Sequence, residues 1–315
     1  MAATQRRKGE TPITDAGNTL KLALLVALSM MSAIYIFWWW RNARAQRTGA
    51  PSLVQMAIGF VTNFFDTLGI GSFALTTAAY KLLGIVRDEN IPGTLVVGHT
   101  LPSLAQAFIF LTVINVDPVL LVLMVLAMTL GAWFGAGLVS RLPRRGIQIG
   151  MGLALLVAAW SLLMSQFGLF PAGGNAIGLS VGRMVIAVAF YFLFGALLTV
   201  GIGHYAPSLV LFSLLGLNVR AAFPIMASAA SFAGPFAGLR FLAKQRCDPR
   251  AALGLTLGGI PGVLLAAFVV KSLPLDVLRW LVVVVIVYTA VMMLRSARAE
   301  RRAELQFRPQ EASES

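Results

Sequence analysis

Long apolar runs, separated by short polar and basic stretches, dominate the chain. They cover approximately residues 20–40, 53–84, 91–115, 118–139, 146–165, 180–216, 221–243, 251–270 and 276–294. A helix needs about 20 apolar residues to cross a bilayer, and most of these runs have that length. Alternating strands of about ten residues, which a membrane barrel requires, do not occur. The pattern predicts an all-α polytopic membrane protein.

Two of the runs, 53–84 and 180–216, differ from the others in length. Each is too long for one crossing and too short for two, and each contains the sequence Gly-Ile-Gly. Glycine inside a helix costs about 1 kcal/mol relative to alanine, so two close glycines favour an interruption. We therefore expect a broken helix in each run.

The two breaks belong to an internal repeat. An offset of 132 aligns residues 67–103 with 199–235 without a gap, and nine of the 37 pairs are identical. The identical residues of the first copy are Thr67, Gly69, Ile70, Gly71, Ala74, Leu82, Leu83, Gly84 and Pro92. Matched interruptions in two halves of a membrane protein are a pointer to a transport site.

Charge is sparse and unevenly placed. Only 12% of residues are charged, yet the net charge is +13. The basic residues form clusters between apolar runs: Arg41, Arg44 and Arg47; Arg141, Arg144 and Arg145; Lys244, Arg246 and Arg250; Arg295, Arg298, Arg301 and Arg302. Such clusters set orientation in the membrane and face the cytoplasm. They do not favour a nucleic-acid partner.

The distribution of basic residues predicts how the broken runs pass through the bilayer. If each broken run crosses once, the basic residues of the later loops and tail divide 10 to 6 between the two sides. If each run enters and returns, they divide 14 to 2. The second division fits the positive-inside rule better. It predicts two inverted repeats, each a glycine-broken re-entrant hairpin plus three transmembrane helices, with the hairpin tips near the midplane.

These boundaries divide the chain into five parts. They are an N-terminal tail (1–19), an extra transmembrane helix (20–40), a first membrane repeat (53–165), a second membrane repeat (180–294) and a basic cytoplasmic tail (295–315). The run up to Trp40 is longer than the apolar core of a signal peptide, so we expect an uncleaved helix. Cys247, the only cysteine, should face the cytoplasm. These patterns do not determine on which side of the membrane the N-terminus lies.

The breaks also predict a binding site. After each Gly-Ile-Gly a new half-helix begins, at about Ser72 and His204, with unpaired N–H groups and a positive dipole end. Glycines let a ligand approach the backbone closely. We expect an anion to bind between the two tips. The candidate substrate-binding residues are Thr67, Gly69, Gly71, Ser72, Thr199, Gly201, Gly203, His204 and Tyr205. The alternative is that the small residues only allow close helix packing.

Two further residues are candidates for proton coupling. Asp66 is the only acidic residue in the run 53–84, and a carboxylate buried in a membrane is costly unless it takes up a proton. Its alternative role is to accept hydrogen bonds from the broken backbone. His99 is the second candidate, and its alternative role is a hydrogen bond between helices.

Sequence motifs do not favour an enzyme. The chain has no Walker A sequence, no HExxH and no Cys/His spacing typical of a metal site. We expect a protein that is not an enzyme, that binds no metal ion and no cofactor, and that does not use ATP. Its predicted partners are a small anion, protons and the lipid bilayer.

The matched Gly-Ile-Gly segments, the Leu-Leu-Gly sequences and the later prolines resemble those of the TauE/SafE sulfite exporter family, also called the toluene-sulfonate uptake permease family. The likeness covers roughly residues 53–295. It implies transport of sulfite, sulfonates or related anions, driven by the proton gradient, in a bacterial inner membrane. The first copy differs at Ser72, where a third glycine is common, and at Leu75, opposite Pro207.

Two other functions stay open at this point. A cation permease would use Asp66 and His204 as ligands. A membrane assembly factor would transport nothing. The exact substrate, the direction of transport and the oligomeric state are not determined by these patterns.

Overall fold

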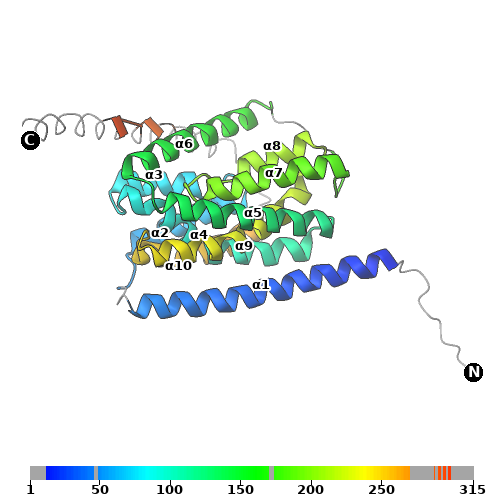
Figure 1. Cartoon of the computed structure of the whole chain (residues 1–315), viewed down its shortest axis with the longest axis horizontal. Helices are drawn as coiled ribbons and strands as arrows, with labels where there is room; N and C mark the ends of the chain where they lie inside the picture. The colour runs from blue at the N-terminus through cyan, green and yellow to red at the C-terminus, as the bar shows by residue number, and fades with distance from the viewer. Residues whose placement is uncertain are drawn as a thin grey trace, which may run out of the picture.

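The computed structural model describes residues 12–45, 49–169 and 174–269, with a few positions between 287 and 298. Helices form nearly all of this part: α1 (Pro12–Ala45), α2 (Leu53–Thr67), α3 (Phe73–Leu83), the short 3-10 helix η1 (Asp88–Asn90), α4 (Ile91–Val113), α5 (Pro118–Val139), α6 (Arg144–Gln166), α7 (Val181–Leu198), α8 (Tyr205–Leu214), α9 (Val219–Ala243) and α10 (Pro249–Val269). Figure 1 shows the long helices lying roughly side by side in one bundle, with α1 along its edge.

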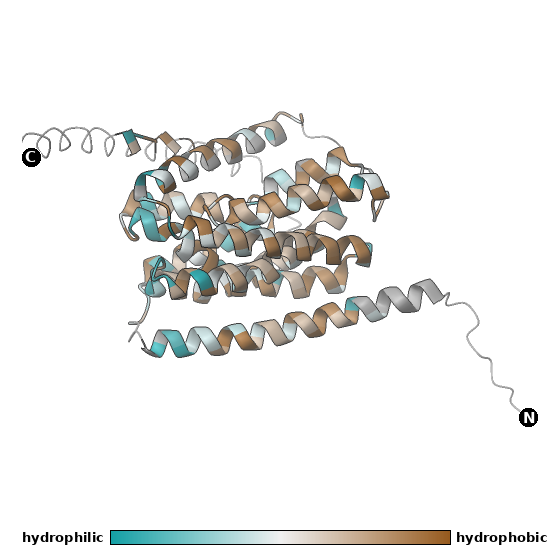
Figure 2. Cartoon of the chain, in the orientation of Figure 1, coloured by the Kyte–Doolittle hydropathy of each residue, from teal (hydrophilic) through white to brown (hydrophobic). Residues whose placement is uncertain are grey.

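Six helices within the described residues are long and apolar enough to cross a bilayer. They are Lys21–Asn42, Asp88–Val113, Pro118–Val139, Val181–Leu198, Arg220–Ala243 and Pro249–Ala267. Hydrophobic residues run along the lengths of these helices, and hydrophilic residues gather near the ends of the bundle (Figure 2). The chain is therefore an all-helical, multi-pass membrane protein. Most of the predicted run 276–294 lies outside the described residues.

Both glycine-containing runs are broken helices. The run 53–84 forms α2 and α3, and the run 180–216 forms α7 and α8. Gly69 and Gly71 have φ angles of 86° and 94°, and Gly201 has a φ of 92°. L-residues with a side chain rarely adopt this left-handed region, so the glycines allow the chain to turn between the half-helices. The interruption expected from the sequence is confirmed.

The α2–α3 segment starts and finishes at the same end of the bundle. Before α2, the carbonyl oxygen of Ala50 accepts a hydrogen bond from Arg250 Nε at 2.8 Å. Near the end of α3, the hydroxyl of Tyr80 donates to the carbonyl oxygen of Ala251 at 3.2 Å. Residues 250 and 251 are neighbours, so Ala50 and Tyr80 both lie near the start of α10.

Hydrogen bonds also connect the two ends of the α7–α8 segment. Arg183 Nη1, in the first turn of α7, donates to the carbonyl oxygen of Leu215, just after α8, at 3.0 Å. Asp117 N, at the start of α5, donates to Ile177 O, just before α7, at 3.0 Å. Because α4 runs from the end of α3 to the start of α5, the contacts of the two broken segments lie at opposite ends of α4. Figure 1 shows α3 at the left end and α8 toward the right.

Helix contacts of the first half recur in the second half. α2 packs along α10, and its counterpart α7 packs along α5. α4 packs against its own counterpart α9 in the centre, while α5 contacts α9 and α10 contacts α4. The breaks in the two hairpins are thereby brought to the middle of the bundle, on either side of α4 and α9.

Glycines permit the close contacts that hold each hairpin. A Cβ atom on Gly131 of α5 would clash with the carbonyl oxygen of Phe192 in α7. A Cβ on Gly258 of α10 would clash with the carbonyl oxygen of Met56 in α2. Small residues of this kind let membrane helices approach backbone to backbone. Glycines of α5 and α10 thus allow these two helices to pack closely against the broken segments.

The extra helix α1 lies against the bundle through one narrow stripe. Leu28, Tyr35 and Trp39 are buried, and the hydroxyl of Tyr35 donates to the carbonyl oxygen of Val97 in α4 at 3.2 Å. The other large residues of α1 are mostly exposed, as expected for a helix that faces lipid. The helix begins at Pro12, and its apolar part, Lys21–Asn42, agrees with the transmembrane span 20–40 expected from hydropathy.

Candidate functional site

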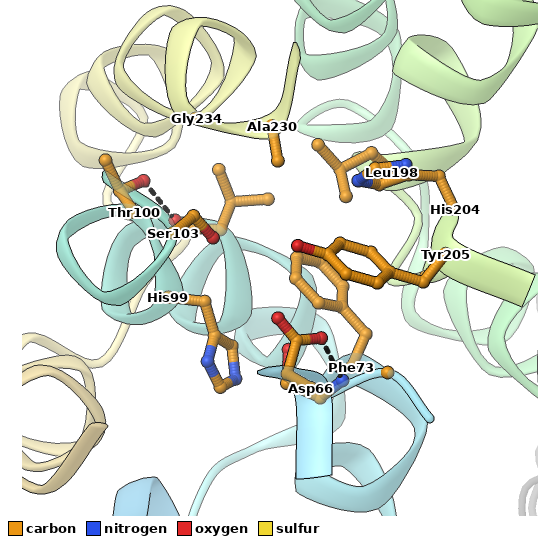
Figure 3. A pocket seen from close by; sticks show the side chains of 14 residues that line it. Asp66, Phe73, His99, Thr100, Ser103, Leu198, His204, Tyr205, Ala230 and Gly234 are labelled. Carbon is orange, nitrogen blue, oxygen red and sulfur yellow. Dashed lines mark hydrogen bonds between the residues drawn. The ribbon is translucent and has the colours of Figure 1, made fainter. Parts of the chain in front are cut away.

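The two breaks face each other across one cavity (Figure 3). Its walls come from the first break, α4, the second break and α9. The lining residues are Asp66, Gly71, Ser72, Phe73, Val96, His99, Thr100, Ser103, Leu198, Gly203, His204, Tyr205, Ala230 and Gly234. The structure therefore brings together seven of the eleven residues that the sequence singled out for substrate binding or proton coupling.

The other four candidates do not line the cavity. Thr67 and Thr199 donate their hydroxyl hydrogens to carbonyl oxygens of their own helices, at 2.9 and 2.6 Å. Gly69 lies against the ring of Phe223, and Gly201 has the positive φ angle that the turn requires. These residues shape the breaks and do not face the cavity.

The start of α3 is capped by a carboxylate of the chain itself. Asp66 is only 4% exposed, and its Oδ1 accepts a hydrogen bond from the backbone N–H of Ser72 at 2.6 Å. A carboxylate at the N-terminus of a helix is stabilised by the helix dipole and by the free N–H groups. Asp66 thus closes the first break as a hydrogen-bond acceptor, and it also faces the cavity.

The start of α8 lacks this carboxylate. By the offset of 132, the position of Asp66 is taken by Leu198. His204 precedes α8 and makes no side-chain cap. Its Nδ1 lies 3.4 Å from the hydroxyl of Ser208, and its buried Nε2 has no hydrogen-bond partner among the described residues. The two half-helices therefore present different chemistry to the same cavity.

His99 connects the arms of the first hairpin. Its Nδ1 lies 3.0 Å from Asn63 Oδ1 in α2, and its Nε2 lies 3.0 Å from Thr76 Oγ1 in α3. The amide nitrogen of Asn63 donates to Gly59 O at 2.8 Å, which leaves its oxygen toward His99. An amide oxygen can only accept, so Nδ1 carries a hydrogen. His99 makes the helix-to-helix bond considered above while also lining the cavity.

Gln106 is a buried residue of α4 that links the two breaks. Its Nε2 donates to Asp66 Oδ2 at 2.9 Å and to Thr67 Oγ1 at 3.1 Å. Its Oε1 accepts a hydrogen bond from the hydroxyl of Tyr205 at 2.5 Å. Sequence reasoning did not place Gln106 in the site, because it lies beyond the aligned repeat 67–103. Its polarity within an apolar helix is the one signal that points to it.

The cavity is small and carries no fixed positive charge. Its volume is about 20 Å³, which holds about one water molecule. Neither lysine nor arginine is among its lining residues, and its one carboxylate belongs to Asp66. In this conformation the cavity is too small for a molecule much larger than water.

A family model described as "Sulfite exporter TauE/SafE" matches residues 12–162 and 168–313. The chain belongs to the TauE/SafE family. No curated protein and no solved structure matches it. The match confirms the resemblance seen in the glycine motifs and extends it across α1. Membership in the TauE/SafE family, together with the six apolar helices, identifies the chain as a membrane transport protein of the permease type.

Proposed function

We propose that this chain is a secondary transporter that moves small sulfur-containing anions, such as sulfite or organosulfonates, across a bacterial inner membrane together with protons. One observation carries the proposal: the unpaired, buried Nε2 of His204 at the start of α8, which lines a cavity shared with Asp66. The substrate site lies between the two hairpin tips.

The start of α8 has the chemistry to hold an anion. This helix of ten residues directs its positive dipole end toward the cavity wall at His204 and Tyr205. If Ser208 donates its hydroxyl hydrogen to Nδ1 of His204, the ring hydrogen sits on Nε2. Nε2–H is then an unused donor. A sulfonate or sulfite presents several acceptor oxygens, and Ser103 supplies another hydroxyl from α4.

Protons would supply the positive charge that balances the anion, because no lysine or arginine lines the cavity. No basic side chain lines the cavity, and an anion would meet the carboxylate of Asp66. Inward movement of one negative charge against a potential of 100 mV costs about 2.3 kcal/mol. A proton on Asp66 removes the repulsion and neutralises a monovalent substrate. His99 is the second candidate to carry the proton, because it lines the same cavity.

Alternating access follows from the arrangement of the hairpins. Each broken segment returns to the end of the bundle where it began, and the two segments begin at opposite ends. The recurrence of the helix contacts in both halves supports an inverted repeat. The 14-to-2 division of basic residues supports a cytoplasmic location of the α2–α3 end. Rocking of one half against the other would open the central cavity to each side in turn.

Transport by the purified protein in liposomes tests the proposal. Radiolabelled sulfite, taurine, sulfoacetate and a divalent metal ion are offered separately, with and without a pH gradient. We expect a sulfur-containing anion to accumulate only with the gradient, and the His204→Ala protein to accumulate much less. Accumulation of the metal alone would establish a cation permease. Absence of all transport by folded protein would favour an assembly factor.

A further inference from the structure

The hydrogen bonds around Asp66 are those of an acceptor. Both carboxylate oxygens face donors: Oδ1 faces the backbone N–H of Ser72 at 2.6 Å, and Oδ2 faces the amide nitrogen of Gln106 at 2.9 Å. A proton on Oδ2 that points along the bond to Gln106 would meet an amide hydrogen. A protonated Asp66 can therefore donate to Gln106 only if that amide turns.

The bond to Gln106 is the one that can change without moving the backbone. The N–H of Ser72 is fixed by the turn that starts α3, whereas the amide group of Gln106 can rotate by half a turn within almost the same volume. After rotation, Gln106 Oε1 accepts the new hydrogen on Asp66 Oδ2, and the bond from Nε2 to Thr67 Oγ1 is lost. A hydronium ion supplies the proton: one O–H bond forms on Asp66, one O–H bond breaks in hydronium, and a water molecule remains.

Rotation of the Gln106 amide also reverses its hydrogen bond with Tyr205. Before rotation, as in the structure, the hydroxyl of Tyr205 donates its only hydrogen to Gln106 Oε1. After rotation, the NH₂ group of Gln106 faces Tyr205, and the oxygen of Tyr205 becomes the acceptor. Its hydrogen is released and can turn toward the cavity, into which the hydroxyl of Tyr205 points (Figure 3).

We propose that Gln106 is a rotating amide that converts protonation of Asp66 into a hydrogen-bond donor for the bound anion, the hydroxyl of Tyr205. This inference rests on the proposed function and adds its coupling step. With Asp66 ionised, the hydrogen of Tyr205 is held by Gln106 and the anion binds weakly. With Asp66 protonated, the repulsion is gone and one more donor faces the anion. Proton and anion binding then strengthen each other by the same factor.

Other titratable groups around Asp66 do not offer this connection. α4 contributes His99, whose two nitrogens are engaged by Asn63 and Thr76. α8 contributes His204 beside Tyr205, and neither hydrogen-bonds directly to Asp66 among the described contacts. Among the lining residues, α9 contributes only Ala230 and Gly234, and α10 contributes none. The bonded path from Asp66 to the second half runs through Gln106.

The experiment measures how much the hydroxyl of Tyr205 contributes to anion affinity when Asp66 is ionised and when it is protonated. Binding of methanesulfonate, whose sulfonate stays ionised near neutral pH, is followed by calorimetry above and below the pH at which wild-type affinity changes. We expect Tyr205→Phe to weaken binding about tenfold or more at the acid side, as for a hydrogen bond to a charged group, and very little at the alkaline side.

The same comparison in the Gln106→Met protein tests the part that the amide plays. Without Gln106, the hydroxyl of Tyr205 is free at every pH, so Tyr205→Phe should weaken methanesulfonate binding by the same factor at acid and at alkaline pH. In the Asp66→Asn protein, whose amide mimics the protonated acid, Tyr205→Phe should cost the full factor at every pH. This variant also keeps the test available if Gln106→Met does not fold.

The outcomes separate the two proposals. If Tyr205→Phe weakens methanesulfonate binding by the same factor at every pH in a protein that keeps Asp66 and Gln106, the proposed rotation of the amide is wrong. A cost that still changes with pH after Gln106→Met would also overturn it, because the coupling would then act directly through space. Absence of methanesulfonate binding by the wild-type protein at any pH, with other anions equally inactive, would instead remove the proposed function.

Discussion

Asp66 and Leu198 occupy equivalent positions in the two halves, and this difference makes the two half-helix starts unlike. Asp66 accepts the N–H of Ser72 at the start of α3. At the start of α8 the leucine cannot do so, and His204 keeps a nitrogen without a partner among the described residues. In the transporter that we propose, the first end would take the proton and the second end the anion.

The first prediction concerns Asp66→Asn. The asparagine can accept from Ser72 N–H and donate to Gln106, so the break should stay closed, but it cannot release a proton. Exchange of labelled substrate across liposomes should survive, while accumulation driven by a pH gradient should disappear. If the variant accumulates substrate as well as the wild type does, the proton travels on another group and Asp66 is a structural cap.

The second prediction concerns His204. Replacement by alanine removes the unpaired donor and should weaken anion binding about tenfold, with a smaller effect on coupling to protons. His204→Gln is the matched control, because its amide nitrogen can still donate from the same position and should restore part of the affinity. Calorimetric titration of the two purified variants measures both effects. Equal affinities of the alanine variant and the wild type would assign His204 to packing.

Some of the residues at the cavity could be found from the sequence and some could not. Asp66, His99 and His204 stand out because charged or titratable side chains are costly at membrane depth. Thr67 and Thr199 were expected in the site, but a threonine in a helix can bond to a carbonyl one turn earlier, and both do. Gln106 was not among the candidates, because it lies beyond the aligned repeat 67–103.

At the scale of elements, the two glycine turns are not equivalent. Gly71 has a φ of 94°, whereas Gly203 has no positive φ, and a Cβ on Gly203 would make an ordinary contact of 3.5 Å with Phe73 Cβ. The Gly-Ile-Gly motif predicted both breaks, but it could not distinguish a glycine needed for the backbone from one needed for space. That distinction depends on backbone angles and neighbours.

The third prediction separates these two roles. Gly71→Ala should lower stability by about 1–2 kcal/mol, because a side chain is disfavoured in the left-handed region. Gly203→Ala should leave stability nearly unchanged but should reduce substrate binding, since its methyl group projects into the wall of a small cavity. Thermal unfolding in detergent and titration with substrate give the two values.

Gly182→Ala provides the matched control for this pair. Gly182 lies in the first turn of α7 and has no positive φ, and a methyl group added there would meet no atom within 4 Å. Alanine at this position should therefore be neutral or slightly stabilising. If Gly203→Ala binds substrate normally, the second break does not contact the anion.

At the scale of the whole molecule, hydropathy and glycine predicted the helical class, most of the apolar spans and the position of both breaks, because these follow from local properties. The expected transmembrane span 20–40 agrees with the apolar part of α1, Lys21–Asn42. The helix itself begins earlier, because polar residues from Pro12 onward continue it beyond the apolar part. The shared cavity could not be located, because it depends on contacts between α4, α8 and α9.

The fourth prediction tests the orientation of the bundle. Cys247 is an unsuitable probe, since it is only 8% exposed and burial raises the pKa of its thiol to about 12, which keeps it protonated and slow to react with maleimide. Exposed positions in a Cys247→Ser background are better. Val181→Cys, at a site 80% exposed at the start of α7, should react with an impermeant maleimide in intact cells.

Lys244→Cys, at an exposed site after α9, should react only when the cells are opened. Reaction of both positions from the same side would contradict the inverted arrangement. A reversed result would place the α2–α3 hairpin outside.

The small volume of the cavity bears on how many protons leak across the membrane through this protein. Protons cross proteins rapidly along continuous files of water, and a space of about 20 Å³ holds about one molecule. Apolar side chains such as Val96 and Leu198 occupy the wall around it. A proton on Asp66 therefore meets about one water molecule within this cavity. We expect idle copies of this permease to leak few protons, and liposomes that contain the protein without substrate should hold a pH gradient as long as empty liposomes do.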